Sequence, residues 1–166
     1  EEHYAELRKL KKKYKDKIKI EVNVEFDWIK KYKKWIIKEA TKRKYDNRFI
    51  SIHFIKEGAE FTPLDWKEEG FKKILKHFGN VKKLIKWYYS TIRSAIKTNC
   101  FDVVSHFDLV KIWNKDHKYF TGEERWYRKE VSKTLKLMAK KKMKLDLNSK
   151  CLRKPCEEQC PSVAIL

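Results

Sequence analysis

Three segments of the chain place histidine or carboxylate side chains at the end of an apolar, strand-like run. These segments span residues 24–27, 51–54 and 105–108 and contain Glu25, His53 and His106. Imidazole nitrogens and carboxylate oxygens are ligands of hard and borderline divalent metals. Because the carboxyl ends of parallel strands share one rim, we expect these three side chains to converge there as a metal site.

Each of these side chains also has a plainer interpretation. A lone histidine at a strand end is often a satisfied core residue, and a strand carboxylate is often solvated. His3, His77 and His117 lie in charged stretches and are interpreted as structural. Asp27 and Asp108 each follow a candidate ligand by two residues. They could orient that ligand, but helix capping or solvation is the preferred interpretation.

The elements that must position these residues alternate along the chain. Strict apolar–polar alternation and short apolar runs predict strands over residues 18–27, 49–55, 101–105 and 144–148. Helical spacing predicts helices over about residues 1–15, 65–78, 81–96 and 122–142, with 28–43 as helix or lid. Asp65 is the expected cap of the second helix and Gly79 its stop. This order predicts a parallel α/β fold in one domain.

Length and composition fit that fold. The chain has 166 residues, of which 42% are hydrophobic, and this is too apolar for disorder. No apolar run approaches the length of a membrane span, and no apolar signal segment follows the first residues. We expect a soluble, cytoplasmic protein. Because the sequence does not start with Met, it is interpreted as a piece of a longer product.

The net charge of +19 raises the question of nucleic-acid binding. Only seven of the 42 basic residues are arginine, the side chain that reads bases and phosphates with paired hydrogen bonds. Lysines on helix faces are typical of a solvated surface. We therefore expect weak, non-specific nucleic-acid contact and a modest attraction of anionic substrates.

Three of the four cysteines, Cys151, Cys156 and Cys160, cluster near the C-terminus, whereas Cys100 stands alone. Their spacing matches neither a zinc ribbon nor a common iron–sulfur motif. We interpret them as free thiols in a reducing compartment.

Five segments resemble, in order, motifs of the polymerase-and-histidinol-phosphatase (PHP) superfamily, and within it of the monofunctional histidinol phosphatases. The family motifs are Gly-x-Glu-x-Asp, Gly-Ser-Val-His-Phe, Gly-His-x-Asp-Leu, Leu-Glu-x-Asn with a following Leu-Arg, and Tyr-Pro-Ser. The corresponding segments here are residues 17–27, 45–54, 102–111, 145–154 and 161–162. The resemblance keeps its register to Leu166.

The chain also departs from the family pattern. Such enzymes begin with a His-x-His strand and finish with an Asp-x-His strand, both metal-binding, and neither is present. Asp146 stands where the family has Glu, and Cys151 and Cys160 stand where it tends to have a small residue and Tyr. The resemblance implies a portion of a distorted (β/α)7 PHP-type barrel. Residues 1–166 would form a single PHP-type domain, truncated at both ends.

The chemistry implied by the resemblance is metal-dependent phosphomonoester hydrolysis. The expected enzyme is a histidinol-phosphatase, which converts L-histidinol phosphate and water to L-histidinol and phosphate in histidine biosynthesis. Glu25, His53 and His106 are the metal ligands carried over, and the ions would be zinc, manganese or iron. Arg153 is the implied substrate phosphate-binding residue, because guanidinium grips phosphate with two hydrogen bonds, and Lys111 adds charge. A surface arginine is the plainer interpretation of Arg153.

Several alternatives stay open. A lone Glu-His-His set binds metal weakly, so a catalytically incomplete remnant could serve as a binding or interaction module. A PHP phosphoesterase with another phosphate substrate and a lysine-rich nucleic-acid binder are the others. No oligomeric state follows from the sequence.

Overall fold

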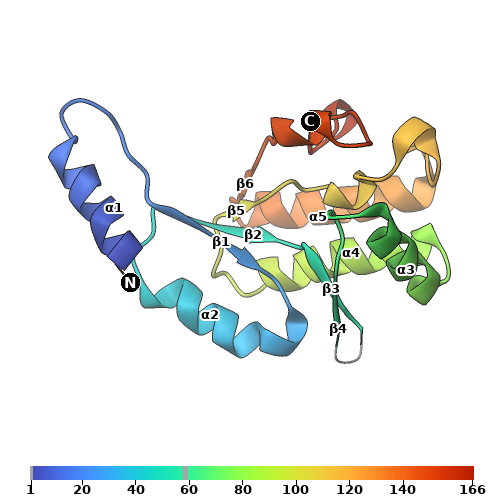
Figure 1. Cartoon of the computed structure of the whole chain (residues 1–166), viewed down its shortest axis with the longest axis horizontal. Coiled ribbons are helices and arrows are strands. Elements are labelled where there is room, and N and C mark those ends of the chain that lie inside the picture. The colour runs from blue at the N-terminus through green and yellow to red at the C-terminus, as the bar shows by residue number, and fades with distance from the viewer. Residues whose placement is uncertain (1, 58–59) are drawn as a thin grey trace.

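A four-stranded parallel sheet forms the centre of the molecule, with strand order β1-β2-β5-β6 (Figure 1). This computed structural model describes residues 2–57 and 60–166. The strands are β1 (Asn23–Asp27), β2 (Asn47–Ser51), β5 (Val103–Val104) and β6 (Lys144–Leu145). Parallel strands joined through helices confirm the predicted α/β class.

Five α-helices accompany the sheet in the described part of the chain: α1 (Glu2–Lys13), α2 (Lys33–Lys42), α3 (Glu68–Phe78), α4 (Val81–Ile96) and α5 (Arg125–Lys140). Helices α4 and α5 lie side by side, whereas α1 lies at the opposite end of the molecule from α3 (Figure 1). Short 3-10 helices lie between these elements: η1 (Lys30–Tyr32), η2 (Leu109–Lys111), η3 (Lys115–His117), η4 (Ser149–Arg153) and η5 (Val163–Ile165).

Helix α4 supplies much of the core because its apolar residues recur every three or four positions. Leu84, Ile85, Tyr88, Tyr89 and Ile92 are all buried on its inner face. Its first turn is capped by the Asn80 side chain, which accepts the Lys83 N–H at 3.0 Å. The preceding helix α3 stops at Gly79, as predicted, where φ is +78° and glycine avoids a steric cost.

Three predicted strands are shorter than expected, and one of them, β5, keeps only Val103–Val104 of the run 101–105. Strand β1 begins at Asn23, where its partner β2 also begins, and Val22 just before it contacts the segment before β2 through the Asp46 N–H, which its carbonyl accepts, and the Asp46 carboxylate. Strand β2 ends at Ser51, and the chain then forms an antiparallel hairpin of β3 (Phe54–Glu57) and β4 (Glu60–Pro63) that the sequence did not predict. His53 therefore lies between two strands and not inside one.

Helix and strand ends differ in two further places. Asp65 is not the cap of α3, which begins at Glu68 after Lys67. The last strand is only Lys144–Leu145, because Asn148 pairs antiparallel with Cys160. The C-terminal segment thus folds back on itself.

The interpretation of all cysteines as free thiols is wrong for two of them. The Asn148–Cys160 backbone pairing brings Cys160 to Cys151, and a disulfide joins the two, with their Cα atoms 5.9 Å apart. Cys100 is a buried free thiol and Cys156 is a half-buried one. Among the helices of residues 2–57 and 60–166, none is long and apolar enough to cross a membrane.

Candidate metal centre

Glu25, His53 and His106 lie together at the carboxyl ends of three neighbouring strands. Glu25 is on β1, His53 follows β2, and His106 follows β5. One potential ligand atom from each residue can be chosen such that all of them lie within 4.8 Å of one another. The structure therefore brings together all three residues that the sequence pattern singled out.

These three residues are called the ligand group, and His106 is held rigidly in it. It is 7% exposed, and its φ of +25° is a left-handed value that a non-glycine residue adopts at a steric cost. Its Nε2 lies 3.3 Å from Oε1 of Glu25. Its Nδ1 is buried without a hydrogen-bond partner among the described residues. Nε2 is therefore the ring nitrogen that faces Glu25 and is placed to act as a ligand.

Asp27 fixes the orientation of His53. One carboxylate oxygen, Oδ1, accepts the His53 backbone N–H at 3.0 Å and lies 2.9 Å from its ring Nδ1. A carboxylate on one ring nitrogen sets the tautomer that leaves the other nitrogen free to bind a metal. The preferred interpretation of Asp27, capping or solvation, is therefore wrong, and the orienting alternative agrees with the geometry.

Electrostatic interactions within and around the group lower the pKa of Glu25 and raise that of His53. The hydrogen bond with His106 holds the pKa of Glu25 at about 2, against the opposing effect of burial. Burial would by itself lower the pKa of His53, but the hydrogen bond and the charge of Asp27 leave that pKa raised. Glu25 is thus an anion at neutral pH and available as an oxygen ligand.

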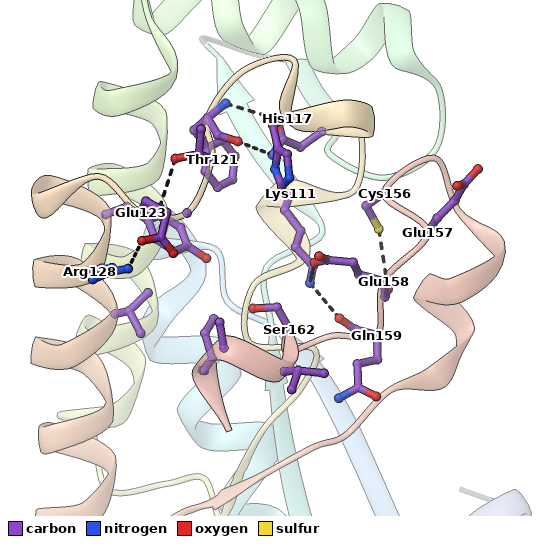
Figure 2. Close-up of a pocket in the computed structure, with 18 of the residues that line it drawn as sticks. Lys111, His117, Thr121, Glu123, Arg128, Cys156, Glu157, Glu158, Gln159 and Ser162 are labelled. Carbon is purple, nitrogen blue, oxygen red and sulfur yellow. Dashed lines mark hydrogen bonds and ion pairs between the residues drawn. The ribbon is translucent and has the colours of Figure 1, made fainter.

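Asp108 and Lys111 bind the C-terminal segment. The Asp108 carboxylate is fully buried, accepts the Ser162 N–H at 2.9 Å and lies 3.1 Å from the Lys111 ammonium. Lys111 also donates to Glu158 at 2.7 Å and to the Gln159 carbonyl at 2.8 Å (Figure 2). Asp108 is thus not solvated, and although it stands at the N-cap position of η2, its side chain makes no capping hydrogen bond. The carboxylates of Asp108 and Glu158 both contact the Lys111 ammonium.

Arg153 is exposed at the end of η4. Asp146, just after β6, accepts the His106 backbone N–H on its carboxylate, with a distance of 3.4 Å. This contact links the segment before η4 to the ligand group. The assignment of Arg153 to substrate phosphate stays a prediction.

A recess of about 580 Å³ adjoins the ligand group and was not predicted from the sequence. Its walls are formed by the end of β1, by η1 and by the start of α2, and its lining residues are Glu25, Phe26, Asp27, Ile29, Tyr32, Trp35 and Ile36. The signal available in the sequence was the aromatic, basic stretch 28–43, which was interpreted only as helix or lid.

A larger cavity of about 1100 Å³ lies between α5 and the C-terminal segment (Figure 2). Its lining residues include none of Glu25, His53 and His106. The ligand group, and not this cavity, is therefore the candidate site for chemistry.

The ligand group fits a divalent metal ion. It offers one carboxylate oxygen and two imidazole nitrogens, a mixture that zinc, iron and manganese accept. Three protein ligands leave coordination positions for water or substrate, as in catalytic metal sites.

The chain is similar to known proteins. The family model "PHP domain" matches residues 1–150. The chain is 28% identical over 160 residues to the histidinol-phosphatase of Bacillus subtilis (strain 168), a match that covers 93% of this chain and 59% of that enzyme. The chain thus spans about three fifths of the length of this relative.

A solved structure shares the fold. The crystal structure of hisK from Listeria monocytogenes, assigned as a histidinol phosphatase, superposes with a TM-score of 0.86 at 20% identity. The superposition covers 98% of this chain and 63% of that one, which confirms the predicted fold as a portion of a PHP-type α/β barrel. The match of the family model to nine tenths of the sequence, together with this fold, shows that the chain belongs to the PHP domain family.

Proposed function

We propose that the chain carries part of the metal-binding site of a metal-dependent phosphomonoester hydrolase. The observation that carries the proposal is the convergence of Glu25, His53 and His106 within 4.8 Å, in a chain of the PHP domain family. Zinc, manganese or iron is the proposed ion. When bound, such an ion polarises a phosphoryl oxygen and lowers the pKa of a water molecule, which is the chemistry that phosphate ester hydrolysis requires.

The protein's own contribution is preorganisation. Asp27 holds the ring of His53, and burial holds that of His106. Glu25 is already deprotonated at neutral pH, because its pKa is about 2. Little reorganisation is then needed when the site is loaded, and this favours catalysis. We assign Arg153 to the substrate phosphate, where a guanidinium would stabilise the developing charge.

The proposed reaction is that of a histidinol-phosphatase, in which L-histidinol phosphate and water give L-histidinol and phosphate in histidine biosynthesis. The similarity to the Bacillus subtilis histidinol-phosphatase supports this substrate. The excess of positive charge on the chain favours the approach of a phosphate ester. We also propose that residues 1–166 act as one PHP-type domain, because the buried apolar side chains form one continuous cluster.

Two measurements test the proposal. Calorimetric titration of the metal-free chain with zinc or manganese should show about one binding site. The Glu25→Gln variant should bind the ion with lower affinity. Phosphate release from L-histidinol phosphate should then be followed for the chain and for a chimera. The chimera joins it to the remaining parts of the Bacillus subtilis histidinol-phosphatase. The proposal is supported if phosphate is released and a chelator abolishes this release. Metal binding with no turnover in either protein would instead favour the binding-module alternative.

A further inference from the structure

A loop closed by a disulfide carries Arg153, the residue assigned above to the substrate phosphate. Cys151 and Cys160, which are nine residues apart in the sequence, form this bond, and both are buried. Arg153 lies between them at the end of η4, where it is exposed. The covalent ring restricts the backbone on both sides of Arg153, so the loop has less conformational freedom to lose when it binds a ligand.

The closed loop is docked on the segment that follows His106. The Lys111 ammonium donates to the Glu158 carboxylate at 2.7 Å and to the carbonyl of the next residue at 2.8 Å (Figure 2). On the other side of the loop, the backbone of Cys160 pairs with that of Asn148, with N–O distances of 2.7 and 3.0 Å. The disulfide thus closes a loop that is held at two places, one of them five residues after a metal ligand.

The third cysteine of this cluster contacts the bonded pair. The Cys156 sulfur lies 3.6 Å from the Cys151 carbonyl oxygen, and Cys156 lines the cavity of about 1100 Å³ (Figure 2). It is half-buried, whereas the bonded residues Cys151 and Cys160 are 5% and 0% exposed. A reductant in solvent therefore reaches Cys156 before it reaches the disulfide. Burial raises the pKa of the Cys156 thiol, so exchange with the disulfide is slow at neutral pH.

Both bonded cysteines are departures from the motifs of the PHP family. Cys151 stands where the family tends to have a small residue, and Cys160 stands where it tends to have Tyr. Such a pair cannot form a cross-link. The disulfide is therefore a property of this chain and is not a requirement of phosphate ester hydrolysis.

We propose that the Cys151–Cys160 disulfide is a redox switch for phosphate binding, and that a dithiol opens it through Cys156. The inference rests on the proposed function, because Arg153 is the group that the closed loop orders. The Cys156 thiolate attacks the Cys151 sulfur, a Cys151–Cys156 bond forms, and the released Cys160 thiolate takes up a proton. The dithiol then reduces this new bond. Its own two sulfurs form a disulfide, and Cys151 and Cys156 each gain a hydrogen.

The first measurement is the number of free thiols and the rate at which they appear. Counted in denaturant, the air-oxidised chain should have two, Cys100 and Cys156, and the chain treated with dithiothreitol should have four. Cys156→Ser should be reduced several-fold more slowly, because the reductant must then reach the buried bond directly. Cys100→Ala, which removes a buried thiol outside the loop, is the matched control and should leave the rate unchanged. An unchanged rate in Cys156→Ser would overturn the entry through Cys156.

The second measurement is the affinity of the manganese-loaded chain for inorganic phosphate, by calorimetry, before and after reduction and removal of dithiothreitol. Manganese is used because thiolates bind zinc. We expect reduction to weaken phosphate binding about threefold to tenfold, since the open loop must then be ordered by the ligand. Cys151→Ala combined with Cys156→Ser cannot form a bond within the loop and should bind like the reduced chain. Arg153→Ala should bind weakly in both redox states. Thermal unfolding should show that these variants keep the fold.

The outcomes separate this inference from the proposed function. Four free thiols in the air-oxidised chain, or equal phosphate affinities in the two redox states, would overturn the switch even if phosphate binding depends on manganese. A redox effect of the same size in Arg153→Ala would also overturn it, because the disulfide would then act on the fold as a whole.

Amide hydrogen exchange decides the case in which phosphate binds in neither state. Faster exchange at residues 154–162 after reduction would support a redox-controlled loop and contradict the phosphatase function. Unchanged exchange would contradict both.

Discussion

One oxygen of Asp27 contacts two nitrogens of His53, the backbone N–H at 3.0 Å and the ring Nδ1 at 2.9 Å. The first contact takes the His53 N–H out of the hydrogen-bond ladder between strands, so β2 ends. The second turns the ring toward Glu25 and His106. A single carboxylate therefore determines both where the chain leaves the sheet and which ring nitrogen is free for a metal.

Replacement of Asp27 with Asn should test this relationship. Asparagine keeps the shape but loses the charge that sets the His53 tautomer, so metal affinity should fall about tenfold to hundredfold while the fold persists. Calorimetric titration with zinc provides the measurement. Asp16→Asn, at an exposed position in the loop after α1, is the control. Equal affinities for the two variants would contradict an orienting role for Asp27.

The complete reaction should depend on the ligand group. We expect the 166-residue chain alone to be a poor phosphatase, because three ligands hold roughly one ion. The chimera with the remaining parts of the Bacillus subtilis histidinol-phosphatase should turn over L-histidinol phosphate only with divalent metal. In that protein His106→Ala should remove most turnover, and Arg153→Ala should mainly raise KM. Rapid, chelator-insensitive release by the short chain would place the chemistry elsewhere.

The Arg48–Asp102 ion pair should make stability depend on pH. Burial tends to raise the pKa of Asp102, but the Arg48 guanidinium and backbone N–H, both 2.8 Å away, hold it below its usual value. Because the carboxyl pKa is lower in the folded state, its contribution is present at neutral pH and lost as the pH falls below about 4.

Arg48→Met should therefore cost about 0.5–1 kcal/mol at pH 7, a modest value because both partners are partly exposed. Urea unfolding of both proteins at pH 7 and pH 3 measures the difference. It should shrink at the lower pH, since the unfolded state then binds a proton at Asp102 and the contribution of the ion pair begins to be lost. A difference that stays constant would assign the effect of Arg48 to packing and not to charge.

Nucleic-acid binding should be weak and steeply dependent on salt. Lysines dominate the positive charge, and displacement of counterions supplies most of the affinity in such cases. Fluorescence anisotropy with a labelled duplex should show binding at about 50 mM salt that disappears near 200 mM. A complex that stays tight above physiological salt would favour the nucleic-acid alternative.

The sequence predicted the parts of the structure that depend on local periodicity. Helix α4 agrees with its predicted bounds because its apolar spacing and the preceding Gly79 stop both indicate the same element. The meeting of Glu25, His53 and His106 was also expected, because parallel strands that share a rim leave little freedom in where their ends lie.

The remaining features depend on contacts between distant residues. The hairpin forms because the His53 N–H bonds to Asp27 and the chain leaves the sheet, which the apolar run 49–55 does not reveal. The Cys151–Cys160 disulfide depends on the backbone pairing of Asn148 with Cys160. The burial of Asp108 depends on Lys111 and on a turn of the chain more than fifty residues later.

The position of His53 between β2 and the hairpin gives the site a built-in linkage. The His53 carbonyl accepts the Leu64 N–H at 2.7 Å, so the hairpin is joined to the ligand residue at both of its ends. A metal ion that binds His53 would restrict the hairpin as well, so ion binding and hairpin order are coupled. By thermodynamic reciprocity, any contact that orders β3 and β4 would strengthen metal binding by the same factor.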